Sequence, residues 1–435
     1  MNEKRSYYEK AYRRVRLARY GVLLFFILFL IFSMTFFREE ITFDNFRYLM
    51  KYLEVSPPEK DGTENLFSFS GNGTAVGMLN GKPFSVSDGT VTSYDLSGRK
   101  LMTESFHYQN PTAVANGRYL LLYDIDGTGI SVYNSFSELY SKNLPTAIES
   151  AYLSDDGGFA VVTREKSYAG GFAVYNNRYK KIYSFMTRTA AVTDVCYDGS
   201  GNRAACASPD AQNGDFYTEI LTFDLNQDDD IKAKATLVGE MPLSMFCAGE
   251  HFALMTDRGV HFYDYDANET AFCDFAYETP QAFYRFADSF AVVLKSSLAG
   301  TDTALRYYDF SGSLLYSEYY DSDIASVYAA DGYLYVLQPH SVHILTRDEN
   351  GVSLRETVPT DGDVRAVFPV DGEEYLLISS GHVSLRRLSA DENAADAAPD
   401  GNADAADVTD TADSVILANS ANSANSASSA SSASS

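Results

Sequence analysis

A five-residue phrase occurs twice in this 435-residue chain, as YDLSG at residues 94–98 and as YDFSG at residues 308–312. The tyrosine that opens each copy belongs to a series of mostly aromatic residues that recurs about every 42 residues. The series comprises Tyr94, Tyr133, Tyr175, Phe223, Tyr263, Tyr308, Leu345 and Arg386. A period of this length indicates one supersecondary unit that is repeated along the chain.

A second marker follows the same period. A turn of Gly, Asp or Asn precedes a short apolar segment in each unit, as in NGKPFSV, NGRYLLLY and DGYLYVL. In the second unit, turn residues separate four short strand-like segments, PTAVA, RYLLLYD, ISVYN and LYSKNL. The abundance of Tyr (32) and Phe (28) also favours strands over helices. Closely spaced turns between short strands predict an all-β fold.

A repeat of about 42 residues with four strands has the size of one β-propeller blade. The sequence therefore predicts a propeller of about eight four-stranded blades. Seven blades is the alternative, if the first unit is irregular or the fourth, which carries the acidic run NQDDD at residues 226–230. YDLSG and YDFSG are then the same turn in blades one and six. In that turn Asp and Ser accept backbone N–H groups, and Gly supplies the position with positive φ.

The eighth unit lacks a fourth strand, because the chain after SLRRL (384–388) turns into ADENAADAAPDG. An extra strand, NLFSFSG at residues 65–71, precedes the first unit. We expect this strand to complete the last blade, which would close the ring and remove exposed sheet edges.

The N-terminus has the pattern of a membrane anchor. Residues 1–20 form a basic segment with seven Lys and Arg against two Glu, and residues 21–37 contain no charge. Seventeen helical residues span roughly 26 Å, near the lower limit for a bilayer core. The alternative is a cleaved signal peptide, which would have a shorter apolar region and a small-residue cleavage site. We expect an uncleaved, single-pass signal anchor with a cytoplasmic N-terminus and an extracytoplasmic remainder.

Three segments follow the predicted span. Residues 38–63 read as a juxtamembrane amphipathic helix and linker, and residues 64–390 as the propeller ectodomain. Residues 391–435 are acidic and rich in Ser, Ala and Asn, which predicts a disordered tail. SVILA (414–418) is the apolar island of this tail and a candidate docking peptide.

The charged and sulfur-containing residues give no catalytic, cofactor or metal site. The net charge of −25 disfavours nucleic acid as a partner. The four cysteines form no CxxC pair, which argues against structural zinc. Cys196 and Cys206 flank a turn and are either a hairpin disulfide or, in the favoured interpretation, small buried thiols. DYDANE (264–269) matches only the first half of a calcium loop and reads as an acidic turn.

LSDDGGFAVVT (153–163) resembles a phrase of TolB-like and WD-like propellers, and YDLSGRKL resembles a quinoprotein-type repeat. The chain contains no Trp, unlike the blades of both WD and quinoprotein repeats, so no quinone cofactor is expected. As a whole, residues 1 to about 390 resemble an uncharacterised family of membrane-anchored propellers from Gram-positive anaerobic bacteria. That resemblance implies the architecture and no active site.

Two classes of function fit these observations. The first is a non-enzymatic binding or scaffold module at the outer face of the membrane, with a protein or cell-envelope partner on one propeller face. The second is a propeller hydrolase that acts on envelope glycans or peptides. The first is favoured because no acid, Arg or His pattern of a catalytic channel repeats along the chain, although a fold alone does not decide function.

Overall fold

A computed structural model of the protein describes two parts of the chain, one on each side of the boundary between the compact units Met1–Ser56 and Pro57–Ser435. The described residues are 19–21, 23–25, 65–68, 75–212, 214–227, 231–296, 302–330, 332–348, 351–362, 364–371, 374–379, 382–388 and 416–417. The predicted segment 38–63 and most of the predicted span 21–37 lie outside them. Within the described residues, no helix has the length and apolarity needed to cross a membrane.

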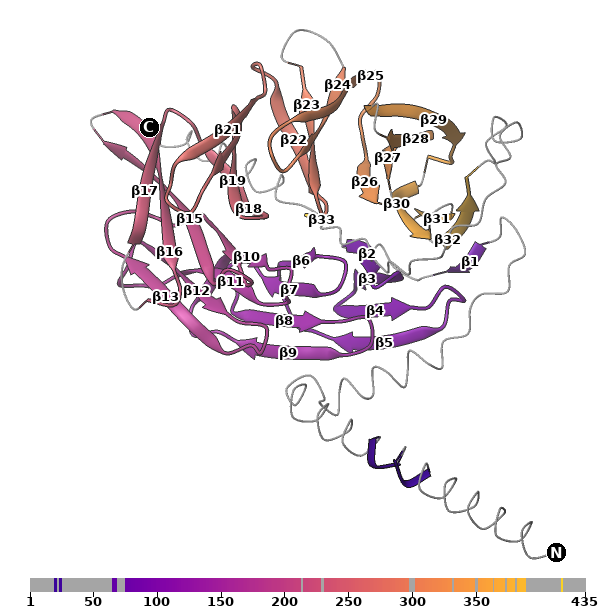
Figure 1. Ribbon diagram of the computed structural model, residues 1–435, viewed down its shortest axis with the longest axis horizontal. Helices are drawn as coiled ribbons and strands as arrows, with labels where there is room; N and C mark the ends of the chain where they lie inside the picture. The colour runs from indigo at the N-terminus through magenta and orange to yellow at the C-terminus, as the bar shows by residue number, and fades with distance from the viewer. Residues whose placement is uncertain are drawn as a thin grey trace, which may run out of the picture. The chain divides into compact units, whose positions relative to one another are not determined.

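The described part of the second unit is all-β and forms eight sheets. Each sheet contains a blade of four strands; seven blades use four consecutive strands, and the eighth combines three strands with one from the start of the unit. The second sheet also has a fifth strand, from the predicted tail. Figure 1 shows these sheets arranged around a ring. The first four blades are β2–β5 (Ala75–Leu79, Lys82–Ser87, Thr90–Tyr94, Lys100–Ser105), β6–β9 (Pro111–Ala115, Leu120–Asp124, Gly129–Tyr133, Glu138–Asn143), β10–β13 (Ala147–Leu153, Phe159–Arg164, Gly170–Tyr175, Lys181–Thr187) and β14–β17 (Asp194–Asp198, Arg203–Gln212, Asp215–Asp224, Ile231–Val238).

The next three blades are β18–β21 (Pro242–Ala248, His251–Thr256, Gly259–Tyr263, Glu269–Asp274), β22–β25 (Thr279–Arg285, Ser289–Lys295, Thr303–Asp309, Leu314–Tyr320) and β26–β29 (Ser326–Ala330, Tyr333–Gln338, Ser341–Asp348, Gly351–Pro359). The eighth blade combines β30–β32 (Val364–Asp371, Glu374–Ser379, His382–Arg387) with β1 (Asn65–Ser68). The predicted eight-bladed propeller is thus confirmed, and the first and fourth units are complete blades.

The ring closes through the strand that precedes the first blade. β1 pairs antiparallel with β32, with Phe67 opposite Val383 and Ser68 opposite His382. This confirms the predicted role of NLFSFSG as the missing outer strand of the last blade. A further short strand, β33 (Ile416–Leu417) within the predicted tail, pairs antiparallel with β6, the innermost strand of the second blade.

The repeated phrase of the sequence is the turn between the third and fourth strands of a blade. Asp95 Oδ1 accepts hydrogen bonds from the backbone N–H groups of Ser97 (3.0 Å) and Arg99 (2.8 Å), and from the Ser97 hydroxyl (2.6 Å). Asp309 accepts the same three kinds of bond in blade six. Gly98 and Gly312 both have φ of +83°, the left-handed conformation expected of this position. In other blades, Asn134, Asn176, Asp224 and Asp264 accept in the same way.

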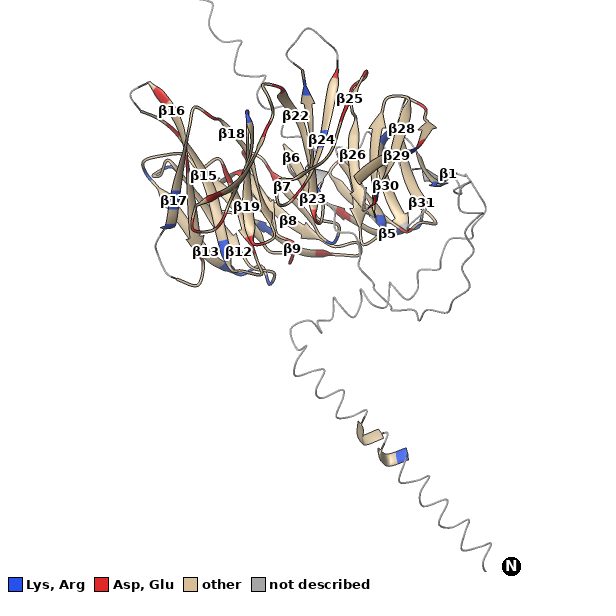
Figure 2. Ribbon diagram, turned by 45° about the horizontal axis from the view of Figure 1, so that its top comes forward, with Lys and Arg blue, Asp and Glu red and all other residues tan. Residues whose placement is uncertain are grey.

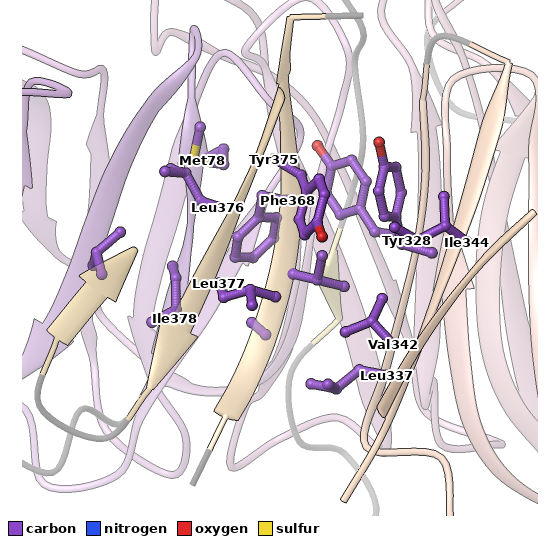
Figure 3. Close-up of a cluster of buried hydrophobic side chains, with 14 of the residues drawn as sticks. Met78, Tyr328, Leu337, Val342, Ile344, Phe368, Tyr375, Leu376, Leu377 and Ile378 are labelled. Atoms are coloured by element: carbon purple, nitrogen blue, oxygen red, sulfur yellow. The ribbon is translucent and has the colours of Figure 1, made fainter. Parts of the chain in front are cut away.

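Each blade buries both faces of its inner strands against its two neighbours. Six apolar clusters join blade one to two, two to three, three to four, four to five, five to six and six to seven. A seventh cluster joins blades seven, eight and one, and Figure 3 shows Phe368 and Tyr375 of the eighth blade between Met78 and Tyr328. All eight interfaces of the ring are therefore packed, which fits the high Phe and Tyr content of the chain.

Strand order gives the ring two different faces. We call the "turn face" the one that carries the turns between first and second and between third and fourth strands. The "loop face" carries the turns between second and third strands and the connections from one blade to the next. β1 starts and β32 ends on the turn face, so the chain enters and leaves the propeller there.

The pairing of β1 with β32 predicts that the propeller depends on residues before the first blade. A chain that starts at residue 62 should unfold cooperatively as a monomer, and a chain that starts at residue 74 should lose a few kcal/mol of stability, because each lost backbone hydrogen bond contributes about 1 kcal/mol. The second chain also exposes the edge of β32, which favours aggregation. Circular dichroism melting and light scattering would measure both effects, and equal stability of the two chains would contradict this role for β1.

Candidate functional site

In the fourth and sixth blades, ASPDAQNGD (207–215) and KSSLAGTDT (295–303) lengthen their units beyond the mean, so the sequence predicts variable loops between the second and third strands there. Both segments include the connection between the second and third strands of their blade, which lies on the loop face. The prediction of a loop is wrong for most of residues 207–215, because β15 and β16 pair from Arg203 and Asp224 as far as Gln212 and Asp215. The polar side chains of this segment belong to a long hairpin that projects from the ring. Residues 297–301 lie outside the described residues.

Large apolar side chains are exposed on the loop face beside this hairpin. They come from β17, β18, β21, β25 and the two connections that link blades four, five and six. The group comprises Val238, Met241, Leu243, Phe272, Tyr277 and Tyr319. We call it the "aromatic ridge". Tyr277 is the most exposed of them, at 95%.

Among the described residues, exposed carboxylates outnumber exposed cations on the loop face of the fifth and sixth blades. Asp257, Asp274, Asp302 and Asp321 are exposed there beside Arg258 and Lys295. Figure 2 shows acidic residues at the ends of β16 and β25. A surface that combines exposed aromatic side chains with negative charge favours a partner that has apolar and basic groups.

Tyr277 sits on a turn that the backbone holds in an unusual conformation. Phe275 accepts a hydrogen bond from Glu278 N (3.0 Å), and the two residues between them, Ala276 and Tyr277, have φ of +53° and +68°. This is the pattern of a type I′ turn, which normally contains Gly, Asn or Asp at both central positions. A bulky side chain with positive φ costs on the order of 1–2 kcal/mol, and such strain often accompanies a functional site.

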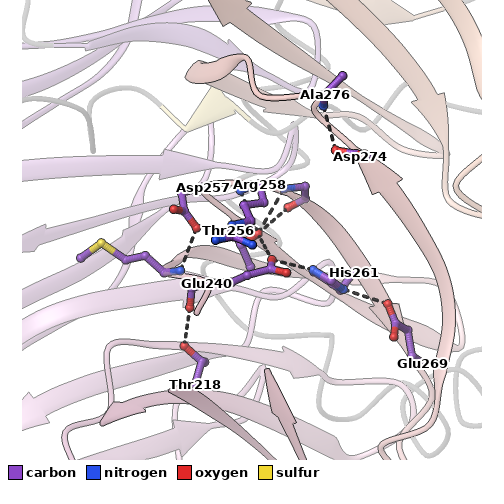
Figure 4. Close-up of polar contacts among 11 residues, drawn as sticks. Thr218, Glu240, Thr256, Asp257, Arg258, His261, Glu269, Asp274 and Ala276 are labelled. Carbon is purple, nitrogen blue, oxygen red and sulfur yellow. Dashed lines mark hydrogen bonds and ion pairs between the residues drawn. The ribbon is translucent and has the colours of Figure 1, made fainter. Parts of the chain in front are cut away.

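The neighbours of this turn hold it in place. Glu278 is almost fully buried and accepts hydrogen bonds from Arg306 (2.5 Å) and from the Tyr319 hydroxyl (3.1 Å). Arg306 also donates to the carbonyl of Asp274 (2.8 Å), whose side chain accepts from Ala276 N (2.8 Å; Figure 4). Burial acts to lower the pKa of Arg306, but Tyr308 and Glu278 raise it above its usual value. The Arg306 guanidinium therefore stays charged, and its hydrogen bonds to Glu278 and Asp274 hold the turn that carries Tyr277.

His261 lies between two carboxylates and packs against Phe272 of the aromatic ridge. His261 is buried, and its Nε2 and Nδ1 lie 2.9 Å from Glu240 Oε2 and 2.8 Å from Glu269 Oε1 (Figure 4). Its ring stacks on Phe272 with 4.3 Å between the centroids. Thr256 donates to Glu240 Oε2 (2.7 Å) and thereby fixes the connection that carries Met241. Carboxylates only accept, so both bonds of the ring form together when both ring nitrogens carry a proton.

A second group of polar residues lies at the turn-face end of the inner strands. Arg285, the last residue of β22, is buried and makes two hydrogen bonds of 3.0 Å with Asp155 in the turn between β10 and β11. Its Nε donates to the carbonyl of Cys247 (3.1 Å), and Cys247 N donates to the Tyr152 hydroxyl (3.1 Å). Burial acts to lower the pKa of Arg285, but Tyr152 and Asp155 raise it above its usual value. The bridge links blades three, five and six.

Asp194 is the first residue of β14, at the loop-face end of the innermost strand of the fourth blade. The residue keeps some exposed surface, but its carboxylate is enclosed and accepts from Met245 N (2.7 Å) and Val195 N (2.9 Å). Burial raises the pKa of Asp194 to about 6, although these hydrogen bonds oppose the shift. Its partners are backbone and serine groups, so the geometry indicates a link between blades four and five and not acid–base catalysis.

Comparison with known proteins agrees with this architecture. A family model described as a family of unknown function, DUF5711, matches residues 64–388. The chain belongs to the DUF5711 family. No curated protein matches the sequence significantly. The C-terminal WD40 domain of Sif2 resembles this DUF5711 propeller with a TM-score of 0.52 and 11% identity, over 74% of this chain and 97% of that domain. The WD40 domain of SCAP from fission yeast gives a TM-score of 0.47 and 12% identity, over 75% and 98% of the two chains.

The structure of this DUF5711 chain tests two further interpretations of its sequence. Cys196 lies opposite Ala205, so Cys196 and Cys206 point to opposite faces of their sheet, and all four cysteines are free thiols. This confirms the interpretation as buried thiols. Asp264 of DYDANE accepts from Asp266 N and Asn268 N, both at 2.9 Å, which confirms an acidic turn. The aromatic ridge and the Arg285–Asp155 bridge were not predicted. Each joins residues from different blades, so no pattern within a single repeat indicates it.

The Arg285–Asp155 bridge predicts that the loss of Asp155 costs more folding stability than the loss of Arg285. The Arg285 side chain is 5% exposed and the Asp155 side chain is 62% exposed. Asp155→Ala leaves a buried cation without its partner and should cost roughly 3 kcal/mol, the low end for such a loss because water screens the pair. Arg285→Met leaves a solvated carboxylate and removes one hydrogen bond to the neutral Cys247 carbonyl, worth about 1 kcal/mol, and should cost less. Urea unfolding of both variants measures the difference, and a larger cost for Arg285→Met would contradict this account.

Proposed function

We propose that this protein is a non-enzymatic binding module, anchored in the membrane by residues 21–37, that captures a protein partner on its loop face. The partner would present apolar and basic side chains to the aromatic ridge. The observation that carries the proposal is the presentation of Tyr277, which is 95% exposed on a turn that buried groups hold in a strained conformation. Tyr is enriched at binding hot spots, and a rigid Tyr loses little conformational entropy on binding.

The elements of the loop face support this choice. The longest hairpin of the propeller, β15–β16, and the aromatic ridge both lie on this face. The acidic groups around the ridge, with the net charge of −25, favour association with a basic partner and disfavour anionic ligands.

Photo-crosslinking tests the proposed face. The full chain would carry p-benzoylphenylalanine in place of Tyr277 in the producing cells, and in place of Leu314 as the control. Leu314 belongs to the same blade and is 55% exposed, but it lies at the turn-face end of β25. We expect a protein adduct at position 277 and none at 314. The captured protein should bind Tyr277→Ala about 10–30-fold more weakly than the unchanged chain, the loss typical of a hot-spot aromatic.

Salt and activity measurements separate the outcomes. Binding should weaken as the salt concentration rises, since the acidic groups are exposed to screening. Identical adducts at positions 277 and 314, or unchanged affinity of Tyr277→Ala, would show that the ridge is not the binding site. Turnover of a glycan or peptide library by the purified chain would instead support the hydrolase alternative.

The membrane orientation has its own test. The excess of Lys and Arg before residue 21 predicts that everything after residue 37 is extracytoplasmic. A reporter enzyme that is active only outside the cytoplasm should be active when it is fused after residue 390. Replacing Arg13, Arg14, Arg16 and Arg19 together by Gln should weaken this orientation. Activity of a cytoplasm-only reporter at the same position would reverse the proposed topology.

A further inference from the structure

A cavity opens on the turn face between the third and fourth blades. Its volume is about 600 Å³, within the range of small-molecule sites, roughly 300–1,000 Å³. All four turns of these two blades on this face line it. They contribute Asp156 between β10 and β11, Asn176 and Asn177 between β12 and β13, residues 199–202 between β14 and β15, and Asn226 between β16 and β17. The cavity therefore depends on the packing of two blades, and it lies on the other face from the aromatic ridge.

Contacts across the blade boundary fix the carboxylate of Asp156 in the cavity wall. Its Oδ1 accepts a hydrogen bond from Gly158 N (2.9 Å). The carboxyl group lies against Gly199 of the fourth blade, where a Cβ would overlap it, so this position needs a glycine. Gly199 N in turn donates to Ser154 Oγ of the third blade (3.2 Å). None of the described residues donates to Asp156 Oδ2, which is left to accept from a ligand.

The asparagines around the cavity keep part of their hydrogen-bonding capacity after the turns have formed. Asn176 Oδ1 accepts from two backbone N–H groups of its own turn (3.1 and 3.0 Å), which leaves its Nδ2 as a donor. Asn202 Nδ2 donates to Asn226 Oδ1 (2.7 Å), which leaves Asn202 Oδ1 as an acceptor. Asn177 is exposed, and its amide has no partner among the residues that the structure describes. The cavity therefore offers both donors and acceptors to a ligand.

Charge and apolar surface narrow the class of ligand. Asp156 is negative, and no Lys or Arg is among the described residues that line the cavity, so an anionic ligand is disfavoured. The cation behind Gly201, Arg203, is paired with Asp198 (2.6 Å). Apolar side chains complete the lining, namely Ile182, Tyr197 and Leu225. A neutral ligand with several hydroxyl groups and with C–H groups between them matches this surface, because each hydroxyl both donates and accepts.

We propose that this cavity binds a neutral sugar residue of a glycan. Hydroxyl groups of the sugar donate to Asp156 Oδ2 and Asn202 Oδ1 and accept from the amides of Asn176 and Asn177, while its C–H groups contact Ile182. The described lining holds one carboxylate, whereas glycoside hydrolysis ordinarily uses a pair, so the cavity supports binding without cleavage. This inference does not depend on the proposed capture of a protein on the loop face.

Glycan binding by the full chain tests this assignment. The protein would be purified in a detergent that has no sugar headgroup and applied to an oligosaccharide array. The array would carry neutral chains of glucose, galactose, mannose and N-acetylglucosamine, and anionic chains of galacturonic acid. We expect binding to at least one kind of neutral chain and none to the anionic chains. Absence of binding to every neutral chain, or a preference for galacturonic acid, would overturn the proposal.

Three variants locate the sugar on the protein by calorimetric titration with the neutral oligosaccharide that binds best. Asn177→Ala and Asp156→Asn should each bind it about three- to tenfold more weakly, because each loses or weakens one hydrogen bond to the sugar. Gln227→Ala is the matched control and should bind as the unchanged chain does. Gln227 donates to Asp224 as its neighbour Asn226 does, but it does not line the cavity. Unchanged affinity of both cavity variants, or an equal loss in Gln227→Ala, would overturn the proposal, and neither result bears on partner capture.

Discussion

Closure of the ring through β1 and β32 is the contact on which the rest of the propeller depends. Second and third strands such as β7 and β8 are buried on both faces, so a blade needs a neighbour on each side to be stable. A ring meets this need only if the last blade is complete. The four residues Asn65–Ser68 supply its outer strand and place the eighth blade between Tyr328 and Met78. The pairing of these four residues with β32 thereby completes the ring, in which all eight interfaces between blades are packed.

Much of this architecture follows from local physics and could be predicted from the sequence. Asx turns depend on an Asp and the two to four residues after it, so Asp95 and Asp309 carry their signal in one short phrase. The same holds for the Asn80–Gly81 turn, in which both residues have positive φ as a type I′ hairpin requires. The hairpin of β15 and β16 was misread as a loop, because its polar residues pair with each other above the ring and bury little apolar surface.

The candidate sites could not be predicted in the same way, because they join residues from different blades. Arg285 and Asp155 are 130 residues apart, and neither stands out from the many charged residues of its unit. His261 of the fifth blade meets Glu240 of the connection that follows the fourth blade. In Ala276–Tyr277, nothing in the residue types indicates a left-handed turn, since the sequence lacks the Gly or Asn that such a turn usually contains. Each of these contacts is a consequence of the closed ring.

Two tyrosines with positive φ, one on each face of the propeller, differ in what stabilises their conformation. On the turn face, Tyr179 also has a positive φ of +59°, but its ring stacks on Tyr140 with 5.0 Å between centroids, so burial offsets the cost of its conformation. Tyr277 has the same kind of backbone and remains 95% exposed, so its own side chain contributes almost no burial energy in the free protein. Its conformation is held instead by Glu278, Arg306 and Asp274. A partner that covered Tyr277 would supply the burial that Tyr140 gives to Tyr179, which is the energetic reason for proposing the loop face as the binding face.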